Sequence, residues 1–280
     1  MIDPADSDQL IKLLRRHRVE LKHSFGQNFI VDPGTRDRIA HASEIEPDDE
    51  VLEVGAGAGG LTVALARMCR RLVAVELDRR LIPVLREVLE GLESVEVVER
   101  DILKFDQSAA FPRGGHVVAG NIPYNLTGAL IRKLLDDPPR PRLLSLVVQK
   151  EVAERWTASS GASLSTVAVQ VFADARIVFT IPASAFTPAP RVDSALVVLD
   201  VRDEPAVHVD DLRAFFRFVE AVFQGRRKQL GGTLGRLNDI GSTPAGARLR
   251  KRGIDPQRRP QTLSLAEWEA IYQEFRGPDG

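Results

Sequence analysis

From about residue 50 onward, short apolar runs alternate with stretches whose apolar residues recur at helical spacing. Five of the apolar runs read as strands, at 50–55, 71–76, 95–100, 115–120 and 142–149. Helical patterns fill three of the intervals, at 61–69, 80–92 and 127–137. Strands that alternate with helices form a mostly parallel sheet with helices on both faces. The sequence therefore predicts a Rossmann-like α/β fold, to which the apolar runs 175–182 and 194–201 could add a terminal antiparallel pair.

The pattern changes after Asp203-Glu204-Pro205, where strand-like runs give way to helical ones. Residues 209–223 predict an amphipathic helix, and residues 264–275 predict another. Ser264 and Glu267 have the spacing of a capping box at the start of the latter. We expect an α/β domain over residues 1–205 and a small all-helical domain over 206–280.

Composition excludes several classes of protein. The chain has 280 residues, a net charge of −1 and a single cysteine, Cys69, so it has no intramolecular disulfide. Five scattered histidines offer no metal-ligand spacing, and we expect no metal. No apolar run approaches membrane-spanning length, and the first residues do not resemble a signal peptide, so we expect a cytoplasmic protein. Charge is uneven: residues 31–110 carry 10 Lys and Arg against 17 Asp and Glu, whereas residues 221–280 carry 11 against 6.

Three consecutive strand ends carry residues suited to an adenosine-containing cofactor. Gly55, Gly57 and Gly59 follow the first strand, and glycine there permits a tight turn close to a ligand. Glu76 ends the second strand, where a carboxylate can accept hydrogen bonds from ribose hydroxyls. Asp101 follows the third and can accept a hydrogen bond from an adenine amino group. Each feature alone is common, but parallel strands bring all three to one edge of the sheet.

The fourth strand ends in an unusual loop, Gly120-Asn121-Ile122-Pro123-Tyr124. Beside an adenosyl cofactor, an Asn-x-Pro-Tyr loop is the arrangement used to methylate an exocyclic amino group. The Asn121 side-chain oxygen and the Ile122 carbonyl can accept the two N–H bonds of that group. Pro123 restricts the loop, and Tyr124 offers a flat face for an unstacked base. These residues predict a methyltransferase that acts on a nucleic-acid base.

The chain resembles the rRNA adenine N6,N6-dimethyltransferases, a family whose relatives include the erythromycin-resistance methyltransferases. The resemblance spans nearly the whole chain and is closest to the bacterial small-subunit branch. It rests on "HSFGQNF" (23–29), "LEVGAGAGGLT" (52–62), "VAVELD" (73–78), "RDILKFD" (100–106), "NIPYNLT" (121–127), "VVQKEVAERW" (147–156), "AFTPAPRVDSAL" (185–196), "FQGRRKQL" (223–230) and "RPQTLSLAEW" (259–268).

This resemblance implies S-adenosylmethionine as the cofactor and assigns roles by position. The cofactor-binding set is Gln27, Asn28, Phe29, Gly55, Gly57, Glu76, Asp101 and Asn121, with Asn28 and Phe29 covering the methionine end. The catalytic set is Asn121, Ile122, Pro123, Tyr124 and Phe186, the last as a second aromatic wall of the base pocket. From the residues alone, Phe186 could equally be a core aromatic. The RNA-binding set is Arg226, Arg227, Lys228, Arg248, Arg250, Lys251 and Arg252.

The implied function is dimethylation of two adjacent adenosines in the 3′-terminal hairpin loop of small-subunit rRNA, within a pre-ribosomal small subunit. A role in small-subunit biogenesis accompanies it. We take a monomer as the default oligomeric state. Two alternatives stay open: a resistance-type methyltransferase acting on large-subunit rRNA, and a non-catalytic assembly or transcription factor of the same fold. The intact set Gly55, Glu76, Asp101, Asn121 and Tyr124 argues against the latter, because a pure binding module has no physical need for all five.

Overall fold

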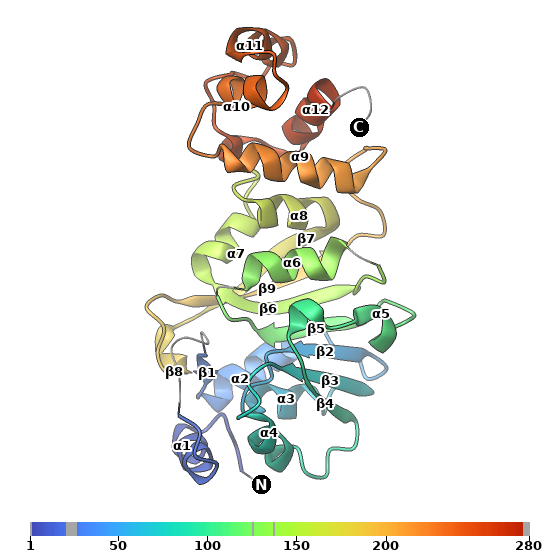
Figure 1. The fold of residues 1–280 in the computed structure, drawn as a ribbon. Helices are drawn as coiled ribbons and strands as arrows, with labels where there is room; N and C mark the ends of the chain where they lie inside the picture. The colour runs from blue at the N-terminus through green and yellow to red at the C-terminus, as the bar shows by residue number, and fades with distance from the viewer. Residues whose placement is uncertain (1, 21–26, 125, 137, 277–280) are drawn as a thin grey trace. The chain divides into compact units, whose positions relative to one another are not determined.

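The computed structural model describes residues 2–20, 27–124, 126–136 and 138–276 (Figure 1). The chain forms two compact units. The first comprises Met1–Glu154 and Asp174–Val201, and the second comprises Arg155–Ala173 and Arg202–Gly280.

The first unit is built on a seven-stranded sheet with the order β4-β3-β2-β5-β6-β9-β7. Its strands are β2 (Glu50–Val54), β3 (Arg71–Glu76), β4 (Val95–Glu99), β5 (Val117–Asn121), β6 (Leu143–Gln149), β7 (Ala173–Ile181) and β9 (Ser194–Val201). Neighbouring pairs from β4 to β6 are parallel, and β9 pairs antiparallel with β6. The predicted α/β fold is confirmed, and the two late runs, 175–182 and 194–201, do occupy adjacent places at one end of the sheet.

The central strands of the sheet are mostly apolar, because successive residues point to opposite faces and both faces are covered. Val51, Leu72 and Val117 belong to one large core cluster, which also takes in buried residues of the surrounding helices. Their neighbours Leu52, Val73 and Val118 point to the other face and are equally buried. A sheet covered on both faces needs apolar side chains at successive positions, and the sequence shows this pattern.

Helices and short connections complete the first unit. They are α1 (Ser7–Arg16), α2 (Pro33–His41), α3 (Gly60–Leu65), α4 (Ile82–Val88), η2 (Ile102–Lys104), α5 (Gln107–Ala110), α6 (Thr127–Asp136) and η3 (Ala183–Ala185). A separate two-stranded antiparallel sheet joins β1 (Phe29–Ile30) to β8 (Phe186–Thr187). The helix α7 (Lys150–Trp156) runs from the first unit into the second.

The second unit is helical. It contains α8 (Leu164–Phe172), α9 (Leu212–Gln224), α10 (Leu230–Leu237), α11 (Ser242–Lys251), η4 (Pro260–Thr262) and α12 (Leu265–Phe275). An aromatic core holds α9 and α12 together, with the rings of Phe215 and Tyr272 at 5.4 Å and those of Phe223 and Trp268 at 5.1 Å. The predicted capping box of Ser264 and Glu267 is confirmed.

The second unit also includes residues 155–173, which the sequence placed with the first domain. The reason is the apolar character of α8, most of which is buried, and its contacts with α9 and α12. The stacked rings of Phe172 and Phe216, 5.7 Å apart, show the same packing. A single cut after residue 205 cannot describe a unit assembled from two separate segments of chain.

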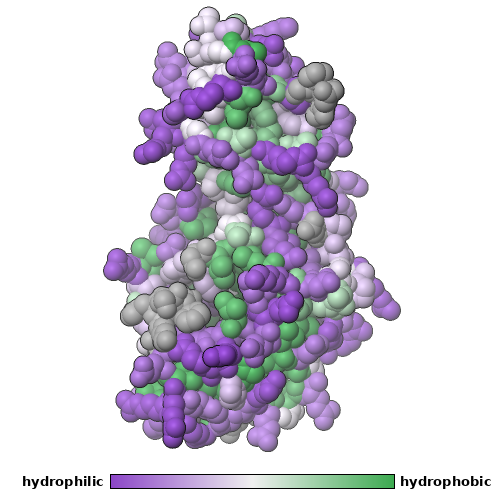
Figure 2. All heavy atoms as spheres, in the orientation of Figure 1, coloured by the Kyte–Doolittle hydropathy of each residue, from purple (hydrophilic) through white to green (hydrophobic). Residues whose placement is uncertain are grey.

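Hydrophilic residues dominate the face of the molecule drawn in Figure 2, with apolar residues between them. Among the helices that the structure describes, none is long and apolar enough to cross a membrane. In the same part of the chain, no group of three or more His, Cys, Asp or Glu side chains is placed to hold a metal ion.

Candidate active site

A cavity of about 310 Å³ opens at the carboxyl ends of β2, β3, β4 and β5. Because these strands are parallel, their ends meet at one edge of the sheet. The cavity is lined by Pro4, Gln27, Asn28, Phe29, Ile30, Glu53, Val54, Gly55, Ala56, Gly57, Ala58, Gly60, Leu61, Val75, Glu76, Leu77, Arg100, Asp101, Ile102, Asn121, Pro123 and Leu126. All eight residues predicted to bind the cofactor therefore lie around one space.

The glycine-rich turn between β2 and α3 is shaped by left-handed backbone conformations. Gly57 has φ +60°, and a Cβ atom there would lie 3.1 Å from the Cε1 atom of Phe29. Its N–H donates a hydrogen bond of 2.8 Å to the Oε2 atom of Glu76. Glycine at this position thus permits both the turn and the approach of Phe29 to the cavity.

Glu76 is 7% exposed and uses both carboxylate oxygens. While Oε2 accepts from Gly57, Oε1 accepts from the backbone N–H of Asp78 at 2.8 Å. Burial raises the pKa of Glu76, and these two N–H donors oppose that shift. At the next strand end, Asp101 caps the short helix η2 by accepting from Leu103 N at 3.0 Å. Backbone N–H groups thus hold the carboxylates of Glu76 and Asp101, which lie at the ends of adjacent strands and line the cavity.

The segment before β1 connects to the loop after β5. The Asn121 side-chain nitrogen donates a hydrogen bond of 2.6 Å to the backbone carbonyl of Asn28. This bond occupies the nitrogen side of the amide, so the Asn121 oxygen remains the acceptor that the side chain can offer to a ligand. Gln27 donates to the Asp78 carboxylate at 3.0 Å. Residues 23–26 of the same predicted motif lie outside the described residues.

The loop itself is held by close contacts with the sheet. Gly120 is required where it lies, since a Cβ atom there would be 2.5 Å from the Val54 carbonyl oxygen. Ile122 is buried, and its N–H donates to the Val147 carbonyl at 3.1 Å. Tyr124 is partly buried, and its hydroxyl lies 2.9 Å from that of Ser194. Asn121 and Pro123 line the cavity, whereas Ile122 and Tyr124 do not.

Phe186 is buried in the first unit. It is 3% exposed, belongs to the main core cluster and pairs with Ile30 across the β1–β8 ladder. The structure does not bring it to the cavity. Its backbone lies in an antiparallel pair that turns the side chain into the core. The role as a second aromatic wall remains a prediction without support from its position.

Glu53 is a cavity residue that the sequence reasoning missed. It is 1% exposed, and burial raises its pKa to about 8. Its Oε2 atom is buried and has no hydrogen-bond partner among the described residues. The signal was present, because a carboxylate inside the apolar run "EVLEV" is costly to bury without a function. Pro4, Arg100 and Leu126, which also line the cavity, had no such signal.

The predicted RNA-binding residues all lie in the second unit. Arg226, Arg227 and Lys228 follow α9 and are exposed. Arg248, Arg250 and Lys251 form the last turn of α11 and are also exposed. Arg252, the C-cap residue, is paired with Glu274 at 2.8 Å, so its charge is already partly satisfied within the protein.

Comparison with known proteins decides the family. Residues 18–276 match the family described as ribosomal RNA adenine dimethylase. This chain belongs to that family. The dimethylase is 40% identical to ribosomal RNA small subunit methyltransferase A of Pelotomaculum thermopropionicum, with 100% of each chain covered. It is 38% identical to the protein of the same name from Shouchella clausii, with 95% of each chain covered.

Two solved structures resemble the dimethylase over most of its length. The 23S rRNA methyltransferase ErmE matches with a TM-score of 0.67 and 30% identity, covering 89% of this chain and 100% of that one. A dimethyladenosine transferase from Plasmodium falciparum matches with a TM-score of 0.69 and 27% identity, covering 87% and 96%. The dimethylase is therefore an S-adenosylmethionine-dependent enzyme that methylates rRNA adenine, as the sequence predicted.

The cavity fits S-adenosylmethionine. That molecule carries a positively charged sulfonium, which donates no hydrogen bond, and an ammonium group whose N–H bonds need acceptors. Two acceptor atoms of cavity residues are buried without a partner among the described residues, Gln27 Oε1 and Glu53 Oε2. Buried polar atoms are normally hydrogen-bonded. Two acceptor atoms without a partner at one cavity therefore indicate a ligand that carries hydrogen-bond donors.

Proposed function

We propose that this dimethylase transfers methyl groups to N6 of two adjacent adenosines in the 3′-terminal hairpin loop of small-subunit rRNA. The observation that carries this substrate is full-length identity of 40% to a protein named as a small-subunit methyltransferase, with 100% of both chains covered. Three further relatives of 35–38% identity have the same name. We further propose that the enzyme acts as a cytoplasmic monomer on a pre-ribosomal small subunit and contributes to its biogenesis.

In this proposal, the cavity holds the cofactor. Glu76 accepts hydrogen bonds from the ribose, and Asp101 accepts one from the adenine amino group. Gln27, Asn28 and Phe29 cover the methionine end, where Glu53 adds a carboxylate that can pair with an ammonium group. An ammonium partner would offset the burial that holds the pKa of Glu53 at about 8. When bound, S-adenosylmethionine supplies a methyl group on a sulfonium centre.

The residues of the dimethylase orient the target amino group. The nitrogen of an adenine amino group is a poor nucleophile because its lone pair is delocalised into the ring. Asn121 Oδ1 and the Ile122 carbonyl accept its two N–H bonds, which directs the lone pair toward the cavity. The bond from Asn121 Nδ2 to Asn28 O keeps the amide in that orientation. Catalysis by positioning requires this fixed geometry.

The chemistry needs no dedicated general base. Once the amino nitrogen had accepted the methyl group that S-adenosylmethionine would supply, with the thioether leaving, the nitrogen would be positively charged and its proton acidic. That proton passes to water, with the Asn121 oxygen as a relay. The flipped base stacks on the ring face of Tyr124. The Tyr124 hydroxyl is hydrogen-bonded to Ser194, which fixes the ring. The second methylation acts on N6-methyladenosine, whose single remaining N–H bond is accepted by one of the two oxygens.

The test is transfer of labelled methyl groups from S-adenosylmethionine to undermethylated small subunits, with large subunits in parallel. We expect label in N6,N6-dimethyladenosine of small-subunit rRNA. Asn121→Ala should lose at least about 100-fold in rate, because the substitution removes an acceptor for the substrate. It also removes the hydrogen bond to Asn28 O, so the affinity for S-adenosylhomocysteine is measured alongside and rates are compared at saturating cofactor. Label in large subunits alone would assign the enzyme to the resistance branch. No label in either, with cofactor binding intact, would overturn the catalytic function.

A further inference from the structure

The first residues of the chain reach the cavity, although no pattern in the sequence indicated it. Pro4 is buried and lines the cavity. It lies against the start of α3, since a Cβ atom on Gly60 would be 3.7 Å from the Pro4 carbonyl carbon and from Ala5 N. Ala5 has no exposed surface. We call residues 2–5 the strap; it places Pro4 in the cavity wall.

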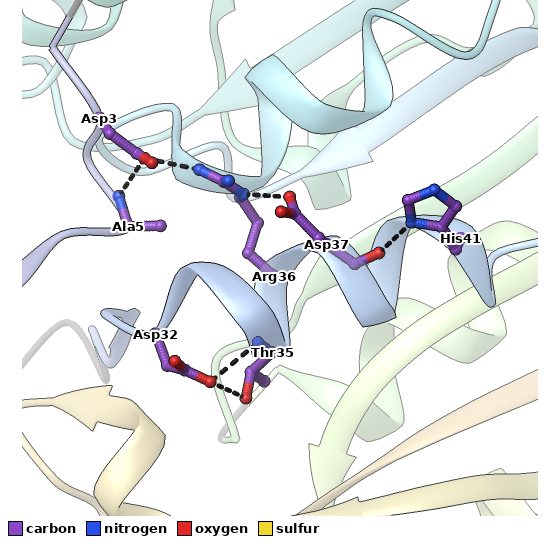
Figure 3. A network of polar contacts seen from close by, with 7 residues as sticks. All are labelled: Asp3, Ala5, Asp32, Thr35, Arg36, Asp37 and His41. Atoms are coloured by element: carbon purple, nitrogen blue, oxygen red, sulfur yellow. Dashed lines mark hydrogen bonds and ion pairs between the residues drawn. The ribbon is translucent and has the colours of Figure 1, made fainter.

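The strap is fastened through Asp3 (Figure 3). The Oδ1 atom of Asp3 accepts from Ala5 N at 2.9 Å and from Arg36 Nη1 at 2.6 Å. The N–H of Asp3 donates to the side-chain oxygen of Gln9 in α1 at 2.9 Å. One side chain therefore turns the strap back on itself and joins it to α2.

Arg36 is well placed to hold the strap. Its side chain is only 11% exposed, and its Nε atom donates to Asp37 Oδ1 at 2.7 Å. The hydrogen bond to Asp37 is the main cause of the raised pKa of Arg36, with Asp3 adding to it. A guanidinium held between two carboxylates and largely removed from water is less screened by salt than a surface pair.

The ion pair joins the strap to α2, which itself does not line the cavity but follows a segment that does. Arg36 lies in α2, which follows β1 directly, and β1 continues the segment 27–30 at the cavity. The structure places α2 and α3 in contact with β1 as well. Displacing the strap would remove Pro4 from one wall while residues 27–30 remained in place.

We propose that the strap is a wall of the cofactor site and that the Asp3–Arg36 ion pair keeps it closed over the bound cofactor. This inference rests on the proposed assignment of the cavity to S-adenosylmethionine. Asp3 and Arg36 are positioning residues, since they act through Pro4 and Ala5. Residues 2–5 close the site, so loss of the pair raises the dissociation constant of the cofactor.

The test is calorimetric titration of the full chain with S-adenosylhomocysteine. Asp3→Asn and Arg36→Gln should each raise the dissociation constant about five- to tenfold, the loss of one charge-assisted contact. The double variant should be no weaker than either single, because both changes release the same segment. Asp37→Asn is the matched control: it removes the other carboxylate from the same guanidinium and should change affinity by less than about twofold.

Hydrogen exchange supplies a readout that a general loss of stability would not reproduce. In the wild type, S-adenosylhomocysteine should slow exchange of the amides in residues 2–9, and this protection should be absent in Asp3→Asn. If Asp3→Asn and the wild type bound S-adenosylhomocysteine with equal affinity and showed equal protection from exchange, the proposed role of the strap would be wrong. A Glu76→Gln variant separates the two proposals: if it binds S-adenosylhomocysteine as the wild type does, the cofactor assignment itself fails.

Discussion

The hydroxyl of Tyr124 lies 2.9 Å from the hydroxyl of Ser194, which has no exposed surface. Ser194 begins β9 and is opposite Gln149 in the antiparallel pair with β6. The loop tyrosine is thereby tethered to the sheet and not only to its own loop. The tether explains how a residue proposed to hold a flipped base can keep one ring orientation.

Removing the Ser194 hydroxyl should therefore impair catalysis without affecting the cofactor. We expect Ser194→Ala to lower kcat/KM for rRNA about five- to tenfold, the effect of losing one buried hydrogen bond. Tyr124→Phe should cost about as much, and the double variant no more than either single. Ser194→Thr retains the hydroxyl and should restore most of the activity. Fully additive losses would show that the two hydroxyls act independently.

Gly57→Ala tests the contact between the glycine turn and Phe29. The added methyl group would meet Phe29 Cε1 at 3.1 Å at a residue with φ +60°, so both the turn and the cavity wall must shift. We expect the dissociation constant of S-adenosylhomocysteine to rise at least about tenfold. Gly91→Ala is a matched control, because Gly91 has φ +84° with nothing within 4 Å of a Cβ atom. It should lower stability by about 1 kcal/mol and leave affinity unchanged.

Salt dependence of rRNA binding tests the basic residues of α11. Arg250 and Lys251 are exposed, whereas Arg252 is paired with Glu274. If the first two contact phosphates, the double variant Arg250→Ala, Lys251→Ala should reduce the slope of log K against log salt by about 2. Arg252→Ala should leave the slope nearly unchanged. Equal effects from the two variants would show that the Glu274 pair opens on binding.

His116 should make the stability of the first unit depend on pH. Its ring stacks on Phe111 at 4.2 Å, and neither ring nitrogen has a partner among the described residues. Burial lowers the pKa of His116 from its ordinary 6.5 to about 4. The unfolded chain therefore binds the proton more readily than the folded one. Stability from neutral His116 is fully present above pH 6.5 and is lost as pH falls toward 4.

The loss attributable to His116 should approach about 3 kcal/mol over that interval. Urea unfolding of the wild type and of His116→Leu at several pH values measures it. Carboxylates contribute to acid destabilisation in both proteins, so the difference between the two pH profiles isolates the histidine. Parallel profiles would mean that the buried ring does not titrate as inferred.

Much of the fold could be read from the sequence because its signals are local. The strands β2, β3 and β4 were predicted to within about two residues, since each contains a short run rich in β-branched and other apolar residues. The edge that gathers Gly55, Glu76 and Asp101 followed from strand direction alone. The same logic brought Asn121 to the cavity, because it ends the next parallel strand.

Residues whose role depends on distant packing could not be found this way. The burial of Phe186 and its pairing with Ile30 in the β1–β8 ladder could not be predicted from the sequence, and its role in the base pocket stays a prediction. Residues 155–173 belong with the C-terminal helices because the apolar surface of α8 packs on them. The sequence shows that α8 is apolar but not which helices it contacts. Glu53 carried a signal in its burial cost, but only the cavity showed where its carboxylate lies.

The sequence by itself determined the α/β layering, the family and the strand ends that meet at the cavity, because periodicity and glycine chemistry act over a few residues. Only the tertiary structure decided that Pro4 closes the cavity, that Asp3 binds Arg36 and that Tyr124 is tethered to Ser194. Each of these pairs joins residues more than 30 positions apart or segments from different elements. Such contacts are set by how the whole chain packs, and no local pattern records them.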